Sequence, residues 1–102
     1  MTDQSDTSDE WPFEDGPNTP AFTTSYAIVD LSPIVHVVRG SDGDWQFLSV
    51  DGADESALKI VALKTVLSRH PDIKEIGNLQ LGWEAWRSNR DAPWIRRQIV
   101  GR

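Results

Sequence analysis

The clearest hydrophobic pattern in the chain is a pair of β-prone segments separated by a turn. Residues 34–38 read Ile-Val-His-Val-Val, which is almost wholly β-branched and predicts a strand. Asp42-Gly43 follows and favours a hairpin, because both residues tolerate a positive φ. Residues 45–50 form the expected return strand. Its alternation places two sets of side chains on opposite faces: Trp45, Phe47 and Ser49 on one, and Gln46, Leu48 and Val50 on the other.

A helical pattern occupies residues 55–69, after a loop in which Asp54 is a candidate N-cap. Ile60, Leu63 and Leu67 form a tight apolar stripe that neighbouring apolar residues broaden, so most of this helix should be buried. The helix is expected to end at His70, because the residue before a proline is driven out of the α region.

The remaining segments complete the expected fold. Residues 22–29 suit a strand or a short helix, residues 72–76 a single turn, and residues 83–87 and 94–100 two further strands. Strands grouped on either side of one helix predict an α+β fold, with one main helix packed on a small antiparallel sheet of about four to five strands.

Charge divides the chain into two parts. The net charge of the 102 residues is −6. Residues 1–20 hold six acidic residues and no Lys or Arg, whereas residues 21–102 hold ten acidic and ten basic residues. We therefore expect 1–20 to be a disordered acidic tail and 21–102 to be a single domain. Trp11 and Phe13 lie among the tail's acids, where they could fold back onto the domain or dock a partner.

Several functional classes are disfavoured. The chain has no cysteine, which excludes disulfides and thiolate zinc sites. It shows no apolar run long enough for a membrane span and no secretory signal, so a cytoplasmic location is expected. No nucleophile elbow, phosphate loop or histidine pair with metal-ligand spacing is present. No catalytic residue, cofactor or metal is therefore predicted. One enzymatic or small-ligand alternative remains, a site where His36 meets Asp44 or Glu84.

Aromatic and arginine residues concentrate near the C-terminus. Period-two alternation puts Trp83 and Trp86 on opposite faces of their strand, so one of them should lie at the surface. Exposed tryptophan beside arginine has the composition of a protein-binding hot spot. Because the domain body is neutral and the tail acidic, a protein partner is favoured over nucleic acid. The candidate partner-binding residues are Trp86, Arg87, Arg90, Trp94, Arg96 and Arg97, together with Trp11 and Phe13.

Several short motifs together resemble a family of short uncharacterised bacterial proteins. They are Pro33-Ile34, Asp42-Gly43-Asp44-Trp45-Gln46-Phe47-Leu48, Leu63, His70-Pro71-Asp72-Ile73, Leu79-x-Leu81-Gly82-x-x-Ala85-x-Arg87 and Trp94. That family is distantly similar to immunity-protein-33-like proteins, which are predicted antidotes in bacterial toxin systems. The resemblance implies an antidote role and brings no catalytic residues with it.

These observations favour a non-enzymatic protein-binding module, and the family resemblance implies one of the immunity type. Two alternatives remain open. One is a small-ligand-binding or enzymatic domain with a site near His36. The other is an accessory homodimer without a catalytic role, joined through an edge of its sheet. The chain is expected to be a monomer or a homodimer, with no nucleic-acid or membrane partner.

Overall fold

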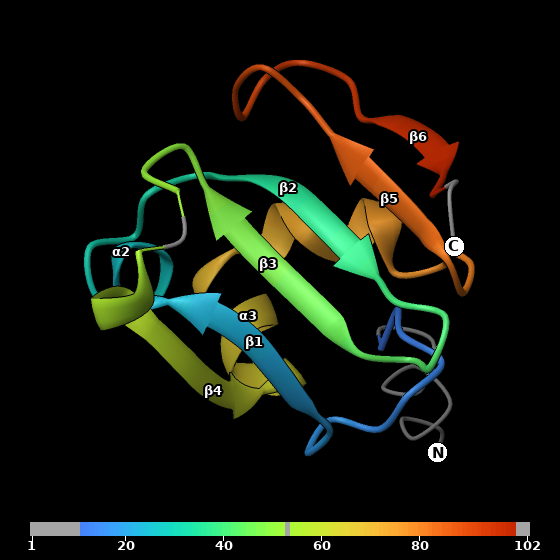
Figure 1. Cartoon of the computed structure of the whole chain (residues 1–102), viewed down its shortest axis with the longest axis horizontal. Helices are drawn as coiled ribbons and strands as arrows, with labels where there is room; N and C mark the ends of the chain where they lie inside the picture. The colour runs from blue at the N-terminus through green and yellow to red at the C-terminus, as the bar shows by residue number, and fades with distance from the viewer. Residues whose placement is uncertain (1–10, 53, 100–102) are drawn as a thin grey trace, which may run out of the picture.

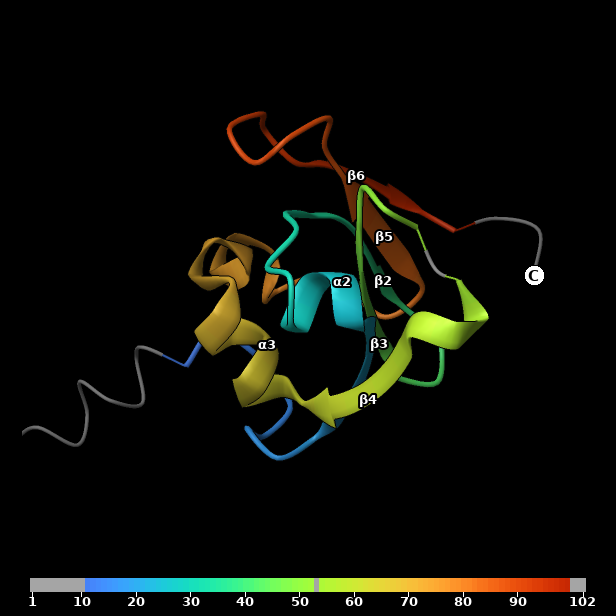
Figure 2. The same cartoon turned by 90° about the vertical axis from the view of Figure 1, so that its left-hand side faces the viewer.

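A mixed sheet forms the centre of the molecule, and α2, α3 and η2 pack on one of its faces (Figures 1 and 2). The computed structural model describes residues 11–52 and 54–99. The elements in chain order are β1 (Pro20–Thr24), α2 (Ser25–Ile28), β2 (Ile34–Arg39), β3 (Trp45–Ser49), the 3-10 turn η1 (Glu55–Ala57), β4 (Leu58–Ala62), α3 (Leu63–Arg69), the 3-10 segment η2 (Pro71–Ile76), β5 (Trp83–Trp86) and β6 (Ile95–Gln98).

The sheet has six strands in the order β4-β1-β3-β2-β5-β6. The predicted α+β class holds, but the expected all-antiparallel sheet of four to five strands is wrong. β1 runs parallel to β3, whereas the other neighbouring pairs are antiparallel. The residues predicted as a strand or a short helix, 22–29, contribute to both, because the chain leaves β1 directly into α2. The Thr24 side chain accepts a hydrogen bond from the N–H of Ala27 and so caps this helix.

The β2–β3 hairpin confirms the strongest sequence pattern. Trp45, Phe47 and Ser49 are buried, whereas Gln46 on the opposite face is exposed. In the turn, Gly43 adopts a positive φ of +98°, whereas Asp42 does not. The alternation of β3 therefore identifies the buried face of the central strand.

The predicted helix over 55–69 is wrong in its first half. Glu55–Ala57 forms the short 3-10 turn η1, Leu58–Ala62 forms β4 and pairs along its whole length with β1, and only Leu63–Arg69 is α-helical. Asp54 accepts a hydrogen bond from the Tyr26 hydroxyl and makes no side-chain cap. The β-branched residues Ile60 and Val61 suit a strand as well as a helix, so pairing with β1 decides between the two. The predicted end of the helix at His70 is confirmed.

The segment before β1 is part of the hydrophobic core. We call residues 11–19 the strap. Phe13 in the strap is 5% exposed, and its ring meets the Trp45 ring edge-on at 5.1 Å between centroids. Asp15 accepts a hydrogen bond from Trp45 Nε1 at 2.9 Å. Trp11 donates to the Asp15 carbonyl. The disorder predicted for 1–20 therefore does not apply to residues 11–20, and residues 1–10 lie outside the described part of the chain.

Arg39, at the end of β2, joins the strap to the loop that follows η2. Its Nη1 donates to the Leu79 carbonyl at 2.8 Å, and its Nη2 lies 3.2 Å from a Glu14 carboxylate oxygen. The guanidinium also lies over the Trp45 ring, 5.0 Å from its centroid. The sequence-based picture omitted these contacts because acidic composition alone indicates a solvated tail. Here the acids of the strap are the acceptors for a buried arginine and a buried indole.

The core fills the space between the inner sheet face and the helical segments. Its helical side consists of fully buried aliphatic side chains, namely Ala27, Leu63, Val66, Ile73, Ile76 and Leu79. His70 is also buried, and its Nε2 lies 2.8 Å from the Ala27 carbonyl. This contact joins the end of α3 to α2. None of the helices in the described ranges is long and apolar enough to cross a membrane.

Candidate functional site

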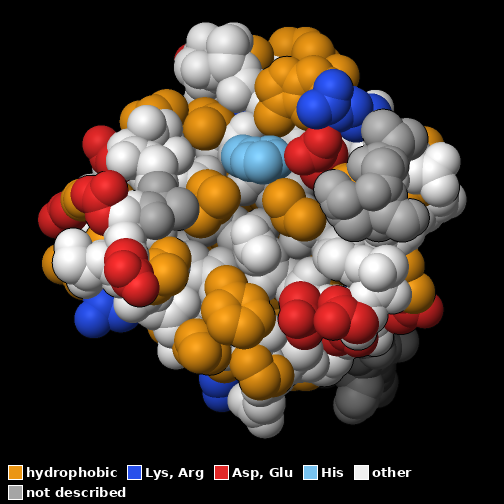
Figure 3. Space-filling model, in the orientation of Figure 1, with side chains coloured by type: hydrophobic (Ala, Val, Ile, Leu, Met, Phe, Trp, Pro, Cys, Tyr) orange, Lys and Arg blue, Asp and Glu red, His pale blue; other side chains and the backbone are white. Residues whose placement is uncertain are grey.

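The sheet has one face without a helical cover in the described residues. Figure 2 shows α2, α3 and η2 on the opposite side, and Figure 3 looks directly onto this open face. Strand register assigns the side chains that point outward here. We define the open face by these residues: Ile60, Phe22, Gln46, Leu48, His36, Val38, Glu84, Trp86, Ile95 and Arg97, with Leu58 at its rim.

One half of the open face, over β4 and β1, is apolar. Phe22 is 38% exposed, Leu58 52% and Ile60 66%. A hollow of about 220 Å³ lies beside them and is lined by Phe22, Thr23, Gln46, Leu48 and Leu58. Exposed apolar side chains gathered on one surface are typical of interaction sites.

The other half, over β2, β5 and β6, combines charge with an aromatic ring. Glu84 accepts a hydrogen bond from Arg97 Nε at 2.8 Å, and its second oxygen lies 2.9 Å from His36 Nε2. The Arg97 guanidinium lies over the Trp86 ring, 4.9 Å from its centroid. Hydrogen bonds from Arg97 and then His36 hold the pKa of the Glu84 carboxyl below its ordinary value of 4.5.

The lowered pKa of Glu84 predicts how acid affects stability. The folded protein binds a proton at Glu84 less readily than the unfolded chain, so this group stabilises the fold above the ordinary carboxyl range and loses that contribution as pH falls through it. Glu84→Gln should therefore reduce the free energy of unfolding by a constant amount above about pH 5, with the difference shrinking at lower pH. Urea unfolding at several pH values measures this. A difference that grows toward low pH would contradict the assignment.

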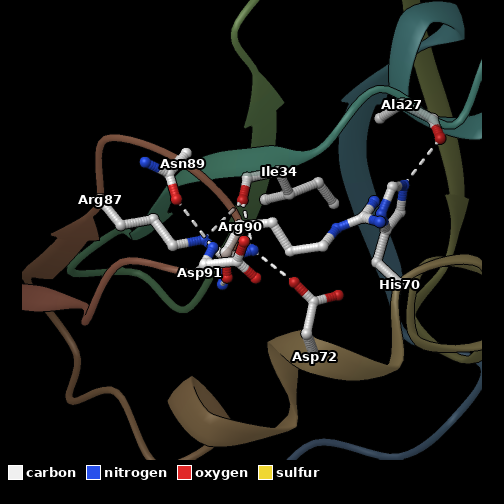
Figure 4. Close-up of polar contacts among 8 residues, drawn as sticks. All are labelled: Ala27, Ile34, His70, Asp72, Arg87, Asn89, Arg90 and Asp91. Atoms are coloured by element: carbon white, nitrogen blue, oxygen red, sulfur yellow. Dashed lines mark hydrogen bonds and ion pairs between the residues drawn. The ribbon is translucent and has the colours of Figure 1, made fainter.

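Arg87, which the sequence placed in the partner-binding set, is a structural residue. It is 5% exposed, and its Nε and Nη2 both donate to the Ile34 carbonyl, at 3.1 and 2.8 Å (Figure 4). Nη1 donates to the Arg90 carbonyl, and Nη2 also pairs with the Asp72 carboxylate. The guanidinium joins β5 to the start of β2, to η2 and to the loop before β6.

The other predicted partner-binding residues divide between the two faces of the sheet. Trp94 packs against the core, with the Arg87 guanidinium 4.1 Å from its ring centroid. Arg96 donates to Asn78 and to the Glu75 carbonyl on the helical side. Arg90 is exposed in the loop before β6.

Within the strap, Phe13 is buried in the core and Trp11 packs against it. The predicted hot spot is therefore wrong as a single patch. Of its members, only Trp86 and Arg97 lie together on the open face, because alternation along β6 sends Arg96 to the other side.

The sequence-based site missed the apolar half of the open face. Phe22, Leu48 and Ile60 belong to strands whose other side chains face the core. A signal was present at Leu48, an apolar residue at an outward position of the predicted strand 45–50. No such signal existed for Ile60, because its segment has a helical pattern of apolar residues.

At the alternative site, the structure gives His36 an acidic neighbour but no described hollow. His36 meets Glu84, as that alternative required, but Asp44 belongs to the β2–β3 turn, where its carbonyl accepts from the Gly40 N–H. Neither the hollow beside Phe22 nor the second described hollow, at Gly82, is lined by His36. In the described ranges, no three acidic or histidine side chains gather as metal ligands.

Comparison of the chain with protein-family models, with curated proteins and with solved structures finds no match. The resemblance to the immunity-protein-33-like group therefore stays a prediction from the motifs in the sequence.

Proposed function

We propose that this chain is a non-enzymatic protein-binding module that recognises its partner through the open face of the sheet. The observation that carries the proposal is the open face itself, where large apolar side chains and a tryptophan–arginine pair lie on a surface that no helix of residues 11–52 and 54–99 covers. Tryptophan and arginine are enriched among the residues that dominate binding energy in protein interfaces. An immunity-type antidote would be one example of such a module, and only the motif resemblance supports that finer reading.

The size of the hollow favours a protein partner over a small molecule. At about 220 Å³ it is smaller than the roughly 300–1,000 Å³ typical of ligand pockets. Its lining is mainly the apolar surface of Phe22, Leu48 and Leu58. A space of this size suits one apolar side chain that projects from a partner's surface.

Charge defines a second feature of the partner. Arg97 is exposed over 65% of its side chain, and Nε is the atom that it donates to Glu84. Its outer nitrogens can therefore meet an acidic group. β3, which lines the hollow, and β6, which carries Arg97, are three strand spacings apart, or roughly 14 Å. We infer a partner that presents an apolar anchor and a carboxylate about that far apart.

A paired comparison tests the proposal. The face variant combines Phe22→Ser with Arg97→Ala. The matched control combines Val29→Ser with Arg96→Ala, which also removes one exposed apolar side chain and one exposed arginine, but from outside the open face. Circular dichroism first establishes that both variants fold. A protein captured from the host by the full chain is then purified, and its binding to each variant is measured by calorimetry.

The expected result is that the face variant binds about tenfold more weakly or worse, while the control binds as the original chain does. Equal binding by both variants would overturn the proposal. So would a loss confined to the control, because it would place the interface on the helical side.

A further inference from the structure

β4 is an edge strand whose outer side can be read from its register with β1. The N–H of Leu63 donates to the Thr19 carbonyl at 2.9 Å, and this pair continues the β1–β4 register. Hydrogen-bonded pairs alternate along an antiparallel ladder. Val61 and Lys59 therefore direct their backbone groups toward β1. Pro20, which has no N–H, lies opposite Ala62 at a non-bonded position, in agreement with this assignment.

It follows that Leu58 and Ile60 direct their N–H and C=O groups to the outer edge, and that Ala62 directs its N–H there, while its carbonyl begins the α3 hydrogen bonds. The N–H of Leu58 is taken by the Glu55 carbonyl within η1. Outside the β1 ladder, no acceptor in the described ranges bonds the N–H of Ile60 or Ala62. The edge therefore offers donors at Ile60 and Ala62 and acceptors at Leu58 and Ile60.

We propose that β4 pairs with β4 of a second copy of this chain, antiparallel about a two-fold axis at Ile60. The edge is self-complementary in this register. The two Ile60 residues exchange N–H···O=C bonds, and the Ala62 N–H of each copy donates to the Leu58 carbonyl of the other. The N–H of Leu58 has no partner in this pairing, but it already donates to the Glu55 carbonyl within η1.

Side chains agree with the same register. Ile60, 66% exposed in one copy, would lie beside Ile60 of the second copy, and Leu58, 52% exposed, beside Ala62. Lys59 would lie opposite Val61, so no like charges meet. In contrast, the other edge strand, β6, carries an exposed arginine on each face, Arg96 on one and Arg97 on the other. Charged side chains discourage pairing at an edge, which makes β4 the edge suited to association.

The pairing joins the two sheets into one and leaves both open faces on the same side, because the axis is normal to the sheet. It does not rest on the proposed function, since the pair forms through the backbone of β4 and needs no protein other than a second copy, although Ile60 and Leu58 belong to both surfaces.

Charge substitution at the axis provides the test. Sedimentation equilibrium of the full chain should show a monomer–dimer equilibrium. Ile60→Lys should weaken dimerisation by about tenfold or more, because two lysines would face each other across the axis. Ile60→Glu should do the same, and an equimolar mixture of the two variants should restore a dimer. Ile95→Lys on β6, which replaces a similarly exposed isoleucine, should leave dimerisation unchanged.

Cross-linking keeps the test decisive if a charged variant fails to fold. The chain has no cysteine, so Ile60→Cys introduces a single thiol. Facing residues in a hydrogen-bonded pair lie about 5.5 Å apart between Cα atoms, within reach of a disulfide. Oxidation should cross-link Ile60→Cys but not Ile95→Cys. A monomeric full chain, preferential cross-linking at residue 95, or no recovery in the lysine–glutamate mixture would overturn the proposal.

Discussion

Phe13→Ala is expected to lower the free energy of unfolding by about 3 kcal/mol, because it removes a buried aromatic ring and leaves a cavity. The ring of Phe13 lies edge-on to both Trp45 and Phe47, which stack on each other with ring planes 6° apart. Urea unfolding followed by tryptophan fluorescence measures the loss. A variant as stable as the original chain would show that the strap adds nothing to the core.

Gly77 lies against Pro12 of the strap, so substituting it tests the packing of the strap independently. A Cβ on Gly77 would lie 2.5 Å from the Pro12 carbonyl oxygen, so Gly77→Ala must displace the strap. The backbone of Gly77 is ordinary helical, with φ −62°, and adds no strain of its own. The expected loss is about 1–3 kcal/mol. Gly16→Ala, within the strap but with no atom nearby, should change stability by less than about 0.5 kcal/mol.

Arg87→Leu is expected to lower the free energy of unfolding by about 2–4 kcal/mol. The substitution removes the two guanidinium N–H groups that donate to the Ile34 carbonyl. It also removes the cation that pairs with the Asp72 carboxylate. Asp72 is 28% exposed and can regain water, which keeps the loss below that of a fully buried pair. Chemical denaturation with circular dichroism detection measures the change.

Arg90→Ala is the matched control for this substitution. Arg90 is a neighbouring arginine that accepts a hydrogen bond from Arg87 Nη1 through its backbone carbonyl. Alanine retains that carbonyl. Its side chain is exposed, so the expected change is within about 0.5 kcal/mol. Similar losses in the two variants would contradict a specific role for the Arg87 guanidinium.

Local hydrophobic patterns predicted the fold correctly where one face of an element is buried and the other is exposed to solvent. The alternation at Trp45, Gln46 and Phe47 identified a strand and its buried side, and His70-Pro71 identified the end of a helix. The pattern at Ile60 and Val61 misled because their apolar spacing fits a helix, and pairing with a strand some forty residues earlier in the chain overrides it. The burial of Phe13 likewise depends on distant rings.

The candidate site was harder to predict because exposure depends on which side of the sheet a residue faces. Arg96 and Arg97 are adjacent and chemically identical, yet Arg96 contacts the helical side and Arg97 lies on the open face. Arg87 is a third arginine in the same region of the sequence, and it is buried. Amino-acid composition was enough to identify the C-terminal region, rich in tryptophan and arginine, as a candidate binding region. The six-stranded register was needed to separate the arginine that can meet a partner from those that hold the fold together.

The position of β1 has a consequence for how the chain folds during synthesis. β2 with β3 and β5 with β6 can pair soon after each is made, since both are local hairpins. β1 sits between β3 and β4, so its partners are complete only once Ala62 has been added. The strap before it must wait for Trp45 and for Leu79. We therefore expect β1 and the strap to reach their native positions after the β2–β3 hairpin has formed, although they are synthesised before it.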